Sequence, residues 1–432
     1  MFAFHIRTLG CRINQYETQA LRESWLARGF TEAGDPGGAD LIVVNSCAVT
    51  ANAVADTRAA LRSLARQAPG ARLVVTGCAC EFCPDDLAAI QGVERVVPQR
   101  GKAGLAAWPE TPPAPGPKEF PDFALADSPR ARALLKVQDG CSHGCSYCVV
   151  PSTRGPSRSR PPAEAVAEAR RLLASGLREI VISGINLRHY GREWGTEWTL
   201  WRLVREMETE LAPEWAGRAR LRLSSLDPAQ LTEEAADTLL GSRMLCPHLH
   251  LSLQSLSPTV LGRMNRGHTS PEAVADFVRL LGREVPVLGL GADFIAGFPG
   301  ETEAEFAETL AAADELPLTY AHVFPYSRRP GTRAASMPDQ VPGPEAKARA
   351  AALRKLAEAK KEDFLHFLAG MRHLEMVLED PDAGTGSEAT FAPCRLIEIP
   401  EWAAPRQLLP CRPEGVSGGA VLVRPDPPKE NA

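Results

Sequence analysis

Short apolar runs alternate with longer amphipathic stretches along most of the chain. In the first hundred residues this pattern predicts three strand and helix pairs: strands over 4–8, 41–45 and 73–76, and helices over 15–28, 53–66 and 84–90. Strands that alternate with helices favour a parallel sheet. We therefore expect an N-terminal α/β domain.

The same alternation returns between residues 132 and 342. Six predicted strands cover 134–137, 179–183, 220–224, 249–253, 288–295 and 321–324. Five predicted helices cover 162–175, 200–211, 228–240, 271–281 and 302–316. Six strands alternating with five helices predict an incomplete (β/α)6 barrel rather than a closed eight-fold one, with ligand-bearing loops after the strands.

Two changes of composition divide the chain. Six prolines between residues 108 and 129 indicate a linker. After residue 370, strand-like pieces over 374–378, 389–394 and 420–423 are broken by Gly and Pro, which predicts a small β-barrel. The predicted organisation is an N-terminal domain over 1–107, a linker over 108–129, a core with a trailing basic helix over 130–369, and a barrel over 370–432.

Three thiols lie within eight residues just after the strand predicted over 134–137. The segment Cys141-Ser-His-Gly-Cys145-Ser-Tyr-Cys148 has C-x3-C-x2-C spacing. Three thiolates can hold three irons of a [4Fe-4S] cluster, leaving one iron open to chelate S-adenosylmethionine. The alternatives are a structural zinc site, which would need His143 as fourth ligand, and a disulfide cluster, which the eleven cysteines and the lack of a secretory leader disfavour.

Cysteines also follow each of the three N-terminal strands. Cys11, Cys47 and Cys78 take equivalent places after them. The carboxyl ends of parallel strands gather at one edge of a sheet, so these thiols should meet and form a second three-cysteine iron-sulfur site. Separate cysteines are otherwise often buried small hydrophobes. Cys80 and Cys83 are possible rival ligands but lack the strand-end position.

Small polar residues and glycines at the ends of the barrel strands are candidate cofactor contacts. The candidates are Tyr147, Gly184, Asn186, Ser225, Gln254, Gly297 and Glu301. The alternative for 297–302 is a turn and helix start, with Thr302 as N-cap.

Basic residues near the predicted barrel mouth could contact phosphates of an RNA substrate. They are Arg154, Arg158, Arg160, Arg328 and Arg329. A net charge of −5 argues against RNA wrapping over the whole surface. No apolar run approaches membrane-spanning length, and the cysteine usage indicates a reducing cytoplasm.

The sequence resembles the radical SAM methylthiotransferase family across nearly its whole length. Besides the two cysteine sets, three segments resemble the branch that acts on threonylcarbamoyladenosine in tRNA: 8–18 (TLGCRINQYET), 264–269 (MNRGHT) and 322–332 (HVFPYSRRPGT). The segment 222–228 (RLSSLDP) resembles the same branch.

The resemblance implies a methylthiotransferase domain, a radical SAM core and a C-terminal TRAM barrel. It implies a [4Fe-4S] cluster on each cysteine set, S-adenosyl-L-methionine as cofactor, and methylthiolation of C2 of N6-threonylcarbamoyladenosine at position 37, next to the anticodon. The expected partners are tRNA, an electron donor such as flavodoxin or ferredoxin, and a sulfur source, with the chain acting as a monomer. Alternative targets are isopentenyladenosine in tRNA and an aspartate of a ribosomal protein; a non-catalytic iron-sulfur RNA-binding protein is the other alternative.

Overall fold

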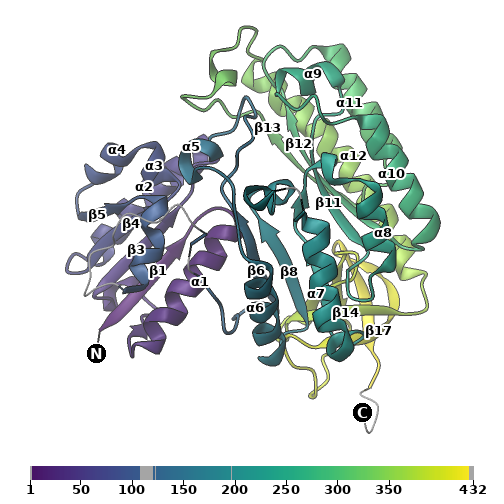
Figure 1. The fold of residues 1–432 in the computed structure, drawn as a ribbon, viewed down its shortest axis with the longest axis horizontal. Coiled ribbons are helices and arrows are strands. Elements are labelled where there is room, and N and C mark those ends of the chain that lie inside the picture. Colours follow the sequence, from purple (N-terminus) through teal and green to yellow (C-terminus); the bar gives the residue numbers. More distant parts are fainter. Residues whose placement is uncertain (1, 108–119, 122, 196, 428–432) are drawn as a thin grey trace.

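The computed structural model describes residues 2–107, 120–121, 123–195 and 197–427, so the predicted linker over 108–129 lies largely outside the described residues. Figure 1 shows an N-terminal α/β unit, a larger α/β unit beside it and a β-barrel at the C-terminal end. No helix within the described ranges is long and apolar enough to cross a membrane.

The N-terminal unit is built on one parallel sheet in the order β2-β1-β3-β4-β5. Its elements are β1 (Ala3–Thr8), α1 (Arg12–Ala27), β2 (Thr31–Glu32), β3 (Leu41–Ser46), α2 (Ala51–Gln67), β4 (Arg72–Gly77), α3 (Ala79–Phe82), α4 (Pro84–Ala88), β5 (Val93–Val97) and the 3-10 helix η2 (Gln99–Ala107). The predicted parallel sheet is confirmed. The short strands β2 and β5 and the single turn α3 were not predicted, because short edge elements carry little periodicity.

Strand β3 explains why this sheet lies between two layers. All six of its residues are buried, which is typical of a strand covered on both faces. Ile42 and Val44 pack against α2, whereas Val43 belongs to a core shared with α1 and the central unit. The N-terminal sheet is therefore continuous in packing with the rest of the molecule.

The central unit contains six parallel strands with helices outside. Its strands are β6 (Arg132–Asp139), β8 (Glu179–Gly184), β9 (Arg220–Leu223) with β10 (Ser225–Leu226), β11 (His248–Gln254), β12 (Gly289–Ala296) and β13 (Tyr320–Pro325). Its helices are α5 (Val150–Arg154), α6 (Pro162–Ala174), α7 (Leu200–Trp215), α8 (Glu233–Gly241), α9 (Pro258–Arg263), α10 (Pro271–Glu284), α11 (Glu303–Glu315) and α12 (Gly343–Ala369). The strand β7 (Arg158–Ser159) pairs antiparallel with β6.

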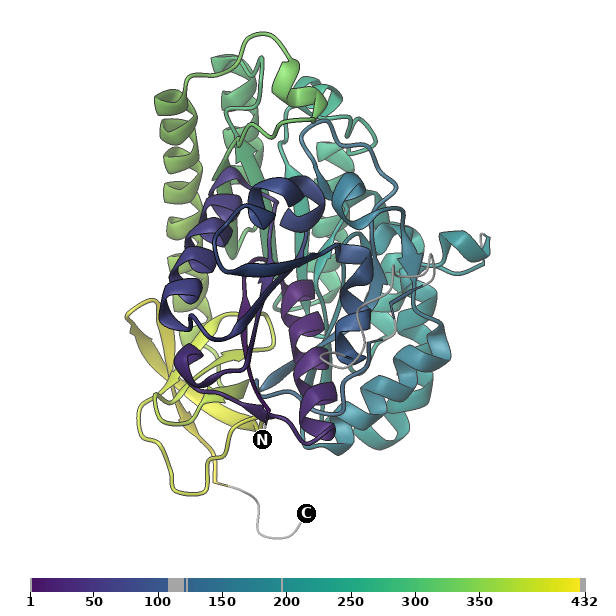
Figure 2. The same ribbon diagram turned by 90° about the vertical axis from the view of Figure 1, so that its left-hand side faces the viewer.

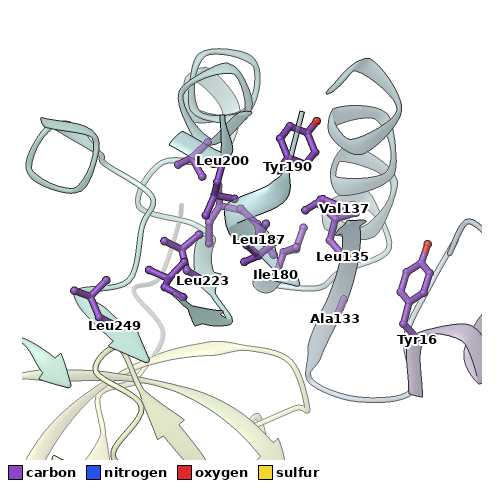
Figure 3. Packing of buried hydrophobic residues seen from close by; sticks show 14 of the residues in the cluster. Tyr16, Ala133, Leu135, Val137, Ile180, Leu187, Tyr190, Leu200, Leu223 and Leu249 are labelled. Atoms are coloured by element: carbon purple, nitrogen blue, oxygen red, sulfur yellow. The ribbon is translucent and has the colours of Figure 1, made fainter. Parts of the chain in front are cut away.

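Two four-stranded sheets, β7-β6-β8-β9 and β10-β11-β12-β13, together carry the six parallel strands. Leu135, Ile180 and Leu223 on successive strands point toward the surrounding helices, where Leu200 of α7 meets them (Figure 3). Alternation along each strand leaves the opposite face more polar; on β11 that face carries His248 and His250. The N-terminal unit stands beside β6, against which α1 packs (Figure 1).

The C-terminal strands close into a barrel in the order β14-β15-β16-β18-β17. They are β14 (Leu374–Asp380), β15 (Thr385–Glu388), β16 (Pro393–Leu396), β17 (Leu408–Ser417) and β18 (Ala420–Pro425). The single strand predicted over 389–394 is wrong, because the Glu388 carboxylate accepts from the backbone N–H of Thr390 (2.7 Å) and Ala392 (3.2 Å) and holds a turn there. Strand β17 was missed because its prolines and glycine break the apolar pattern.

The barrel docks on the lower end of the central strands and on α12 (Figure 2). Glu179, fully buried at the start of β8, binds Arg220 and Arg222 at 2.6 Å each. These guanidinium groups also donate to carbonyl oxygens of the barrel, Arg220 to Ser387 (3.0 Å) and Arg222 to Ala389 (3.0 Å). The aromatic ring of Phe391 lies 5.1 Å from the Arg222 guanidinium.

Candidate active site

The first three predicted ligands lie at one edge of the N-terminal sheet. Cys11 precedes α1, Cys47 follows β3, and Cys78 follows β4, and β1, β3 and β4 are neighbours in the sheet. Gly10 allows the first loop to approach the second: its φ is +89°, and a Cβ there would lie 2.5 Å from Cβ of Cys47. The parallel sheet thus gathers three thiols that are distant in sequence.

Burial distinguishes the thiols of this edge. Cys11 is exposed, whereas Cys47 and Cys78 are buried, and burial raises the pKa of Cys47 to about 11. The two rivals face other groups: the Cys80 sulfur lies 3.9 Å from Oγ of Ser46, and the Cys83 sulfur lies 3.5 Å from the carbonyl oxygen of Ala79. Cys80 therefore faces the end of β3, whereas Cys83 faces the first residue of α3 itself.

The C-x3-C-x2-C loop follows β6, at the carboxyl end of the central strands. Its three cysteines are half-buried, and each lies near an N–H donor. Cys141 faces Nδ2 of Asn186 at 3.4 Å, Cys148 faces the backbone N–H of Val150 at 3.4 Å, and Cys145 lies 4.0 Å from Nη1 of Arg266. Donors aimed at sulfur favour the thiolate, which is the form that binds metal.

The donor set of this loop has the chemistry of an iron-sulfur site. Three thiolates can hold three irons of a [4Fe-4S] cluster, each thiolate binding a different iron. Among the described residues, no group of three or more His, Cys, Asp or Glu side chains is placed around one point as the ligands of a single ion would be. Burial raises the pKa of Cys148 to about 12, and a bound metal would favour its thiolate form.

The Cys141 loop and α3, which begins directly after Cys78, line one cavity. It has a volume of about 480 Å³, and both Cys145 and Cys148 line it from the central unit. Glu81 and Phe82 of α3 line it from the N-terminal unit, directly after Cys78. In Figure 1, α3 and α5 lie next to each other at this junction, and the two helices are in contact.

A buried charge network joins the same two units. The Glu17 carboxylate accepts from Nζ of Lys102 (2.6 Å), Nζ of Lys136 (2.7 Å) and Nη1 of Arg154 (3.0 Å). Asp139 accepts from Lys136 (2.9 Å) and Arg154 (2.8 Å). Burial alone would raise the pKa of Glu17, but the charges of Arg154, Lys102 and Lys136 hold it well below its usual range.

This network supports both cysteine loops. Glu17 lies on the first turns of α1, which begins after Cys11, and Asp139 ends the strand that leads to Cys141. Asn14 adds a direct tie: its Nδ2 donates to the carbonyl oxygens of Leu9 (2.8 Å) and Ser46 (2.9 Å), and its Oδ1 accepts from Arg154 (2.7 Å). The ion pairs therefore fix the relative positions of the two candidate cluster sites.

Two of the arginines predicted to contact RNA are part of this interior instead. Arg154 is 4% exposed and Arg160 is 3% exposed. Arg160 binds the carboxylate of Glu168 and the hydroxyl of Tyr16. Neither arginine can therefore contact a phosphate in this structure. The prediction of RNA contacts failed here because buried carboxylates that are distant in sequence neutralise the two guanidinium groups.

The other three predicted arginines differ from one another. Arg158 is half-buried, 3.7 Å from Asp139. Arg328 is exposed and donates to the carbonyl oxygen of Ala335 (2.8 Å). Arg329 is only 3% exposed and stacks on Phe82, with its guanidinium carbon 4.3 Å from the ring centre. Arg328 is thus the most accessible of the five.

The predicted cofactor contacts fall into two groups. Asn186 and Tyr147 lie at the Cys141 loop: Asn186 faces Cys141, and Tyr147 packs edge-on against Phe298 at 6.4 Å. Gln254 ends β11 with a left-handed φ of 69°, a strained backbone state that is frequent at functional sites. Ser225 is exposed on β10, and Gly184 packs against Gln138.

Gly297 and Glu301 have structural partners. The N–H of Gly297 donates to Oε2 of Glu301 (2.7 Å), and the same oxygen binds Arg349 of α12 (2.9 Å). A Cβ on Gly297 would lie 2.3 Å from Cβ of Ala346 on that helix. Thr302 caps α11, as the alternative for this segment predicts. These residues dock α12 on the barrel.

One polar group at the barrel mouth was missed from the predicted contacts. Asp227, after β10, lies 3.2 Å from Nη2 of Arg266 and 3.2 Å from Nε2 of His268. Arg266 in turn reaches Cys145 and donates to the carbonyl oxygen of Ser252 (2.7 Å). The available signal was the strand-end position of Asp227, the same signal that selected Asn186.

Two family models match this chain. One, the Radical SAM superfamily, covers residues 135–313, and the other, Uncharacterized protein family UPF0004, covers residues 3–98. The first includes the Cys141 loop, and the second includes Cys11, Cys47 and Cys78. The matched segments thus coincide with the two units that meet at the cavity.

Curated relatives match most of the chain. A protein of Bacillus subtilis (strain 168) named threonylcarbamoyladenosine tRNA methylthiotransferase MtaB is 37% identical over 351 residues, which cover 78% of this chain and 76% of the relative. A protein of the same name from Aquifex aeolicus (strain VF5) is 32% identical, covering 86% of this chain and 92% of the relative.

A solved structure shares the fold. It is the radical S-adenosylmethionine methyltransferase TsrM from Kitasatospora setae with cobalamin and a [4Fe-4S] cluster bound, with a TM-score of 0.59 and 18% identity, covering 78% of this chain and 77% of that one. At this identity the likeness concerns the fold alone.

Proposed function

Because the chain belongs to the radical SAM methylthiotransferases of the MtaB type, we propose that it methylthiolates C2 of N6-threonylcarbamoyladenosine beside the anticodon of tRNA. As a radical SAM enzyme it uses S-adenosyl-L-methionine and iron-sulfur chemistry. The exact nucleoside and the use of two clusters are parts of the proposal.

The observation that carries the proposal is the cavity that the Cys141 loop shares with α3, the helix that begins directly after Cys78. A methylthio transfer needs a radical source and a sulfur donor within reach of the same carbon atom, since orientation and proximity dominate such a step. Cys145 and Cys148 line this cavity from one side, and Phe82, four residues after Cys78, lines it from the other. An adenine ring placed there would lie beside Cys145 and Cys148 and next to the helix that follows Cys78.

The side chains have distinct roles in this proposal. Cys141, Cys145 and Cys148 would hold a [4Fe-4S] cluster, which supplies the electron for radical chemistry with S-adenosyl-L-methionine. Asn186 and Arg266, beside Cys141 and Cys145, would stabilise the charge on the thiolates. Asp227 would orient Arg266.

Cys11, Cys47 and Cys78 would hold a second cluster that supplies the sulfur. The buried Glu17 network would keep α1, and with it the Cys11 loop, at a fixed distance from the Cys141 loop. The reaction also requires an electron donor such as flavodoxin or ferredoxin and a sulfur source. We propose that the chain acts as a monomer.

The tRNA would approach at the rim of this cavity. Arg333 lines the cavity and is exposed, and Arg328 on the same loop is exposed as well. Among the described residues, neither arginine forms an ion pair, and each donates to a backbone carbonyl oxygen at 2.8–2.9 Å, so both guanidinium groups are available to phosphates. Phosphate contacts of this kind position RNA without reading its sequence.

Mass spectrometry of tRNA nucleosides from cells with and without the gene tests the substrate. We expect loss of 2-methylthio-N6-threonylcarbamoyladenosine and accumulation of its unthiolated precursor. A change in the isopentenyladenosine derivative instead would assign the other tRNA substrate. An unchanged tRNA profile would reject a tRNA substrate altogether.

Cysteine variants of the purified chain test the division of labour. Cys141→Ala should abolish reductive cleavage of S-adenosylmethionine, whereas Cys47→Ala should retain cleavage and stop sulfur insertion. Each variant should also lose roughly half of the bound iron. If Cys80→Ala has the effect expected for Cys47→Ala, and Cys47→Ala is active, the N-terminal ligand assignment is wrong.

A further inference from the structure

Arg329 is a buried cation, and two of its three guanidinium nitrogen atoms lack hydrogen-bond partners. It lies in the loop after β13 and is 3% exposed. Its Nε and Nη2 atoms are buried without a hydrogen-bond partner among the described residues. Burying a charged donor without a hydrogen-bond partner is unfavourable, so such an arginine requires an explanation.

Arg154 shows what a satisfied buried arginine looks like in the same protein. It is equally buried at 4% exposure, yet it donates to two carboxylates, Glu17 at 3.0 Å and Asp139 at 2.8 Å. Stacking on Phe82 covers one face of the Arg329 guanidinium. It does not satisfy the N–H groups on Nε and Nη2, which lie in the guanidinium plane.

The surroundings of Arg329 place it at the N-terminal cysteine site. Its stacking partner Phe82 lies on α3, the helix that begins directly after Cys78. Phe82 and Pro330, the residue after Arg329, both line the cavity beside Cys145 and Cys148. The loop is anchored on the N-terminal unit, since the backbone N–H of Ala51 donates to Oγ of Ser327 (3.3 Å).

We propose that Arg329 is the anion-binding group of the N-terminal cysteine site, and that its anion is the sulfur species held there for transfer. A guanidinium offers several N–H donors in a fixed plane, which suits an anion presented at a site edge. A cluster with three thiolates and a further sulfide carries net negative charge, which an unpaired cation in a low-dielectric site stabilises strongly. Arg329 reaches this site from the central unit.

The inference rests on the proposed second cluster but not on the identity of the RNA. The test therefore uses the full-length chain with Cys141, Cys145 and Cys148 replaced by Ala, reconstituted so that only the N-terminal site holds iron. Sodium sulfide is the probe. The measurements are the reduction potential and the sulfide concentration that half-saturates the change in the electron paramagnetic resonance spectrum.

Arg329→Gln should lower the reduction potential and weaken sulfide binding at least tenfold, with iron content unchanged. Arg329→Lys should restore part of both, because it keeps the charge but not the planar donors. Arg328→Gln is the matched control on the neighbouring, exposed residue and should alter neither. Stability of the iron-free chain should not fall in Arg329→Gln, since an unpaired buried charge is removed.

An unchanged potential together with unchanged sulfide affinity in Arg329→Gln would overturn the proposal. In that case, a raised KM of Arg329→Gln in the chain with all its cysteines, found only for substrate carrying the threonyl carboxylate, would make that carboxylate the bound anion. Failure of the substrate assignment is a separate event, visible only in the tRNA nucleoside profile, so the two proposals can fail independently.

Discussion

The charge network around Glu17 gives the sharpest prediction on the architecture of the site. Glu17→Gln keeps the shape of the side chain but removes the carboxylate that Lys102, Lys136 and Arg154 share. The new side chain also brings an amide N–H₂ donor among the N–H donors of these three cations. Lys102, Lys136 and Arg154 then face one carboxylate, that of Asp139, instead of two.

Breaking a buried ion pair by removing one partner costs about 3–5 kcal/mol, because the remaining charges stay buried. Glu17 is fully buried and binds its three cations at 2.6–3.0 Å, so the upper part of this range is expected. The exposed pair Arg72–Glu94, at 2.7 Å in the same unit, supplies the control. Glu94→Gln should cost under about 1 kcal/mol, because solvent screens such pairs.

Hydrogen–deuterium exchange of the amides of α1 (Arg12–Ala27) is the appropriate assay, because a chain of several units need not unfold in one step. Glu17→Gln should increase their exchange roughly a thousandfold to several thousandfold. If exchange in Glu17→Gln matches that in Glu94→Gln, the network does not hold α1 against the central unit.

The same carboxylate predicts an acid dependence. Because the folded-state pKa of Glu17 lies well below the unfolded value, the unfolded chain binds the extra proton first as the pH falls. The stability that Glu17 contributes is therefore complete above its unfolded pKa and is lost as the pH falls toward its folded pKa. The protection of the α1 amides from hydrogen exchange should decline as the pH falls in the native chain. In Glu17→Gln, the part of this decline that Glu17 causes should be absent.

Two further substitutions test how the other units are held. Gly297→Ala should destabilise the packing of α12 and lower the melting temperature, because its Cβ would lie 2.3 Å from Cβ of Ala346. Gly300→Ala controls for backbone strain, since Gly300 has a similar φ of +73° and a Cβ there would meet only a flexible arginine side chain at 3.4 Å. Equal melting temperatures of the two variants would refute the clash. Phe391→Ala should weaken docking of the C-terminal barrel by about 2 kcal/mol, because the contacts of its ring with arginine and aromatic side chains are lost. Limited proteolysis should then release the barrel sooner. An unchanged cleavage rate would show that the polar contacts of Arg222 are sufficient to hold the barrel.

The local pattern of apolar and polar residues predicts much of the fold. Apolar periodicity located the longer parallel strands of the N-terminal and central units to within a few residues, because burial on both faces leaves continuous apolar runs such as 41–44. Where local signals conflict, prediction failed. Strand β17 contains Pro410 and Pro413, and the turn after β15 depends on a single buried carboxylate, Glu388.

The sequence by itself identified the two cysteine sets, because spacing and strand-end position are local properties. Only the tertiary structure decided what the charged residues do. Arg154, Arg160 and Arg329 look alike as basic residues near a predicted mouth, yet the first two are neutralised by carboxylates of distant segments and the third is buried with unsatisfied Nε and Nη2 atoms. The fold determines which groups surround a charged side chain, because residues far apart along the chain supply its partners. A local sequence pattern does not contain this information.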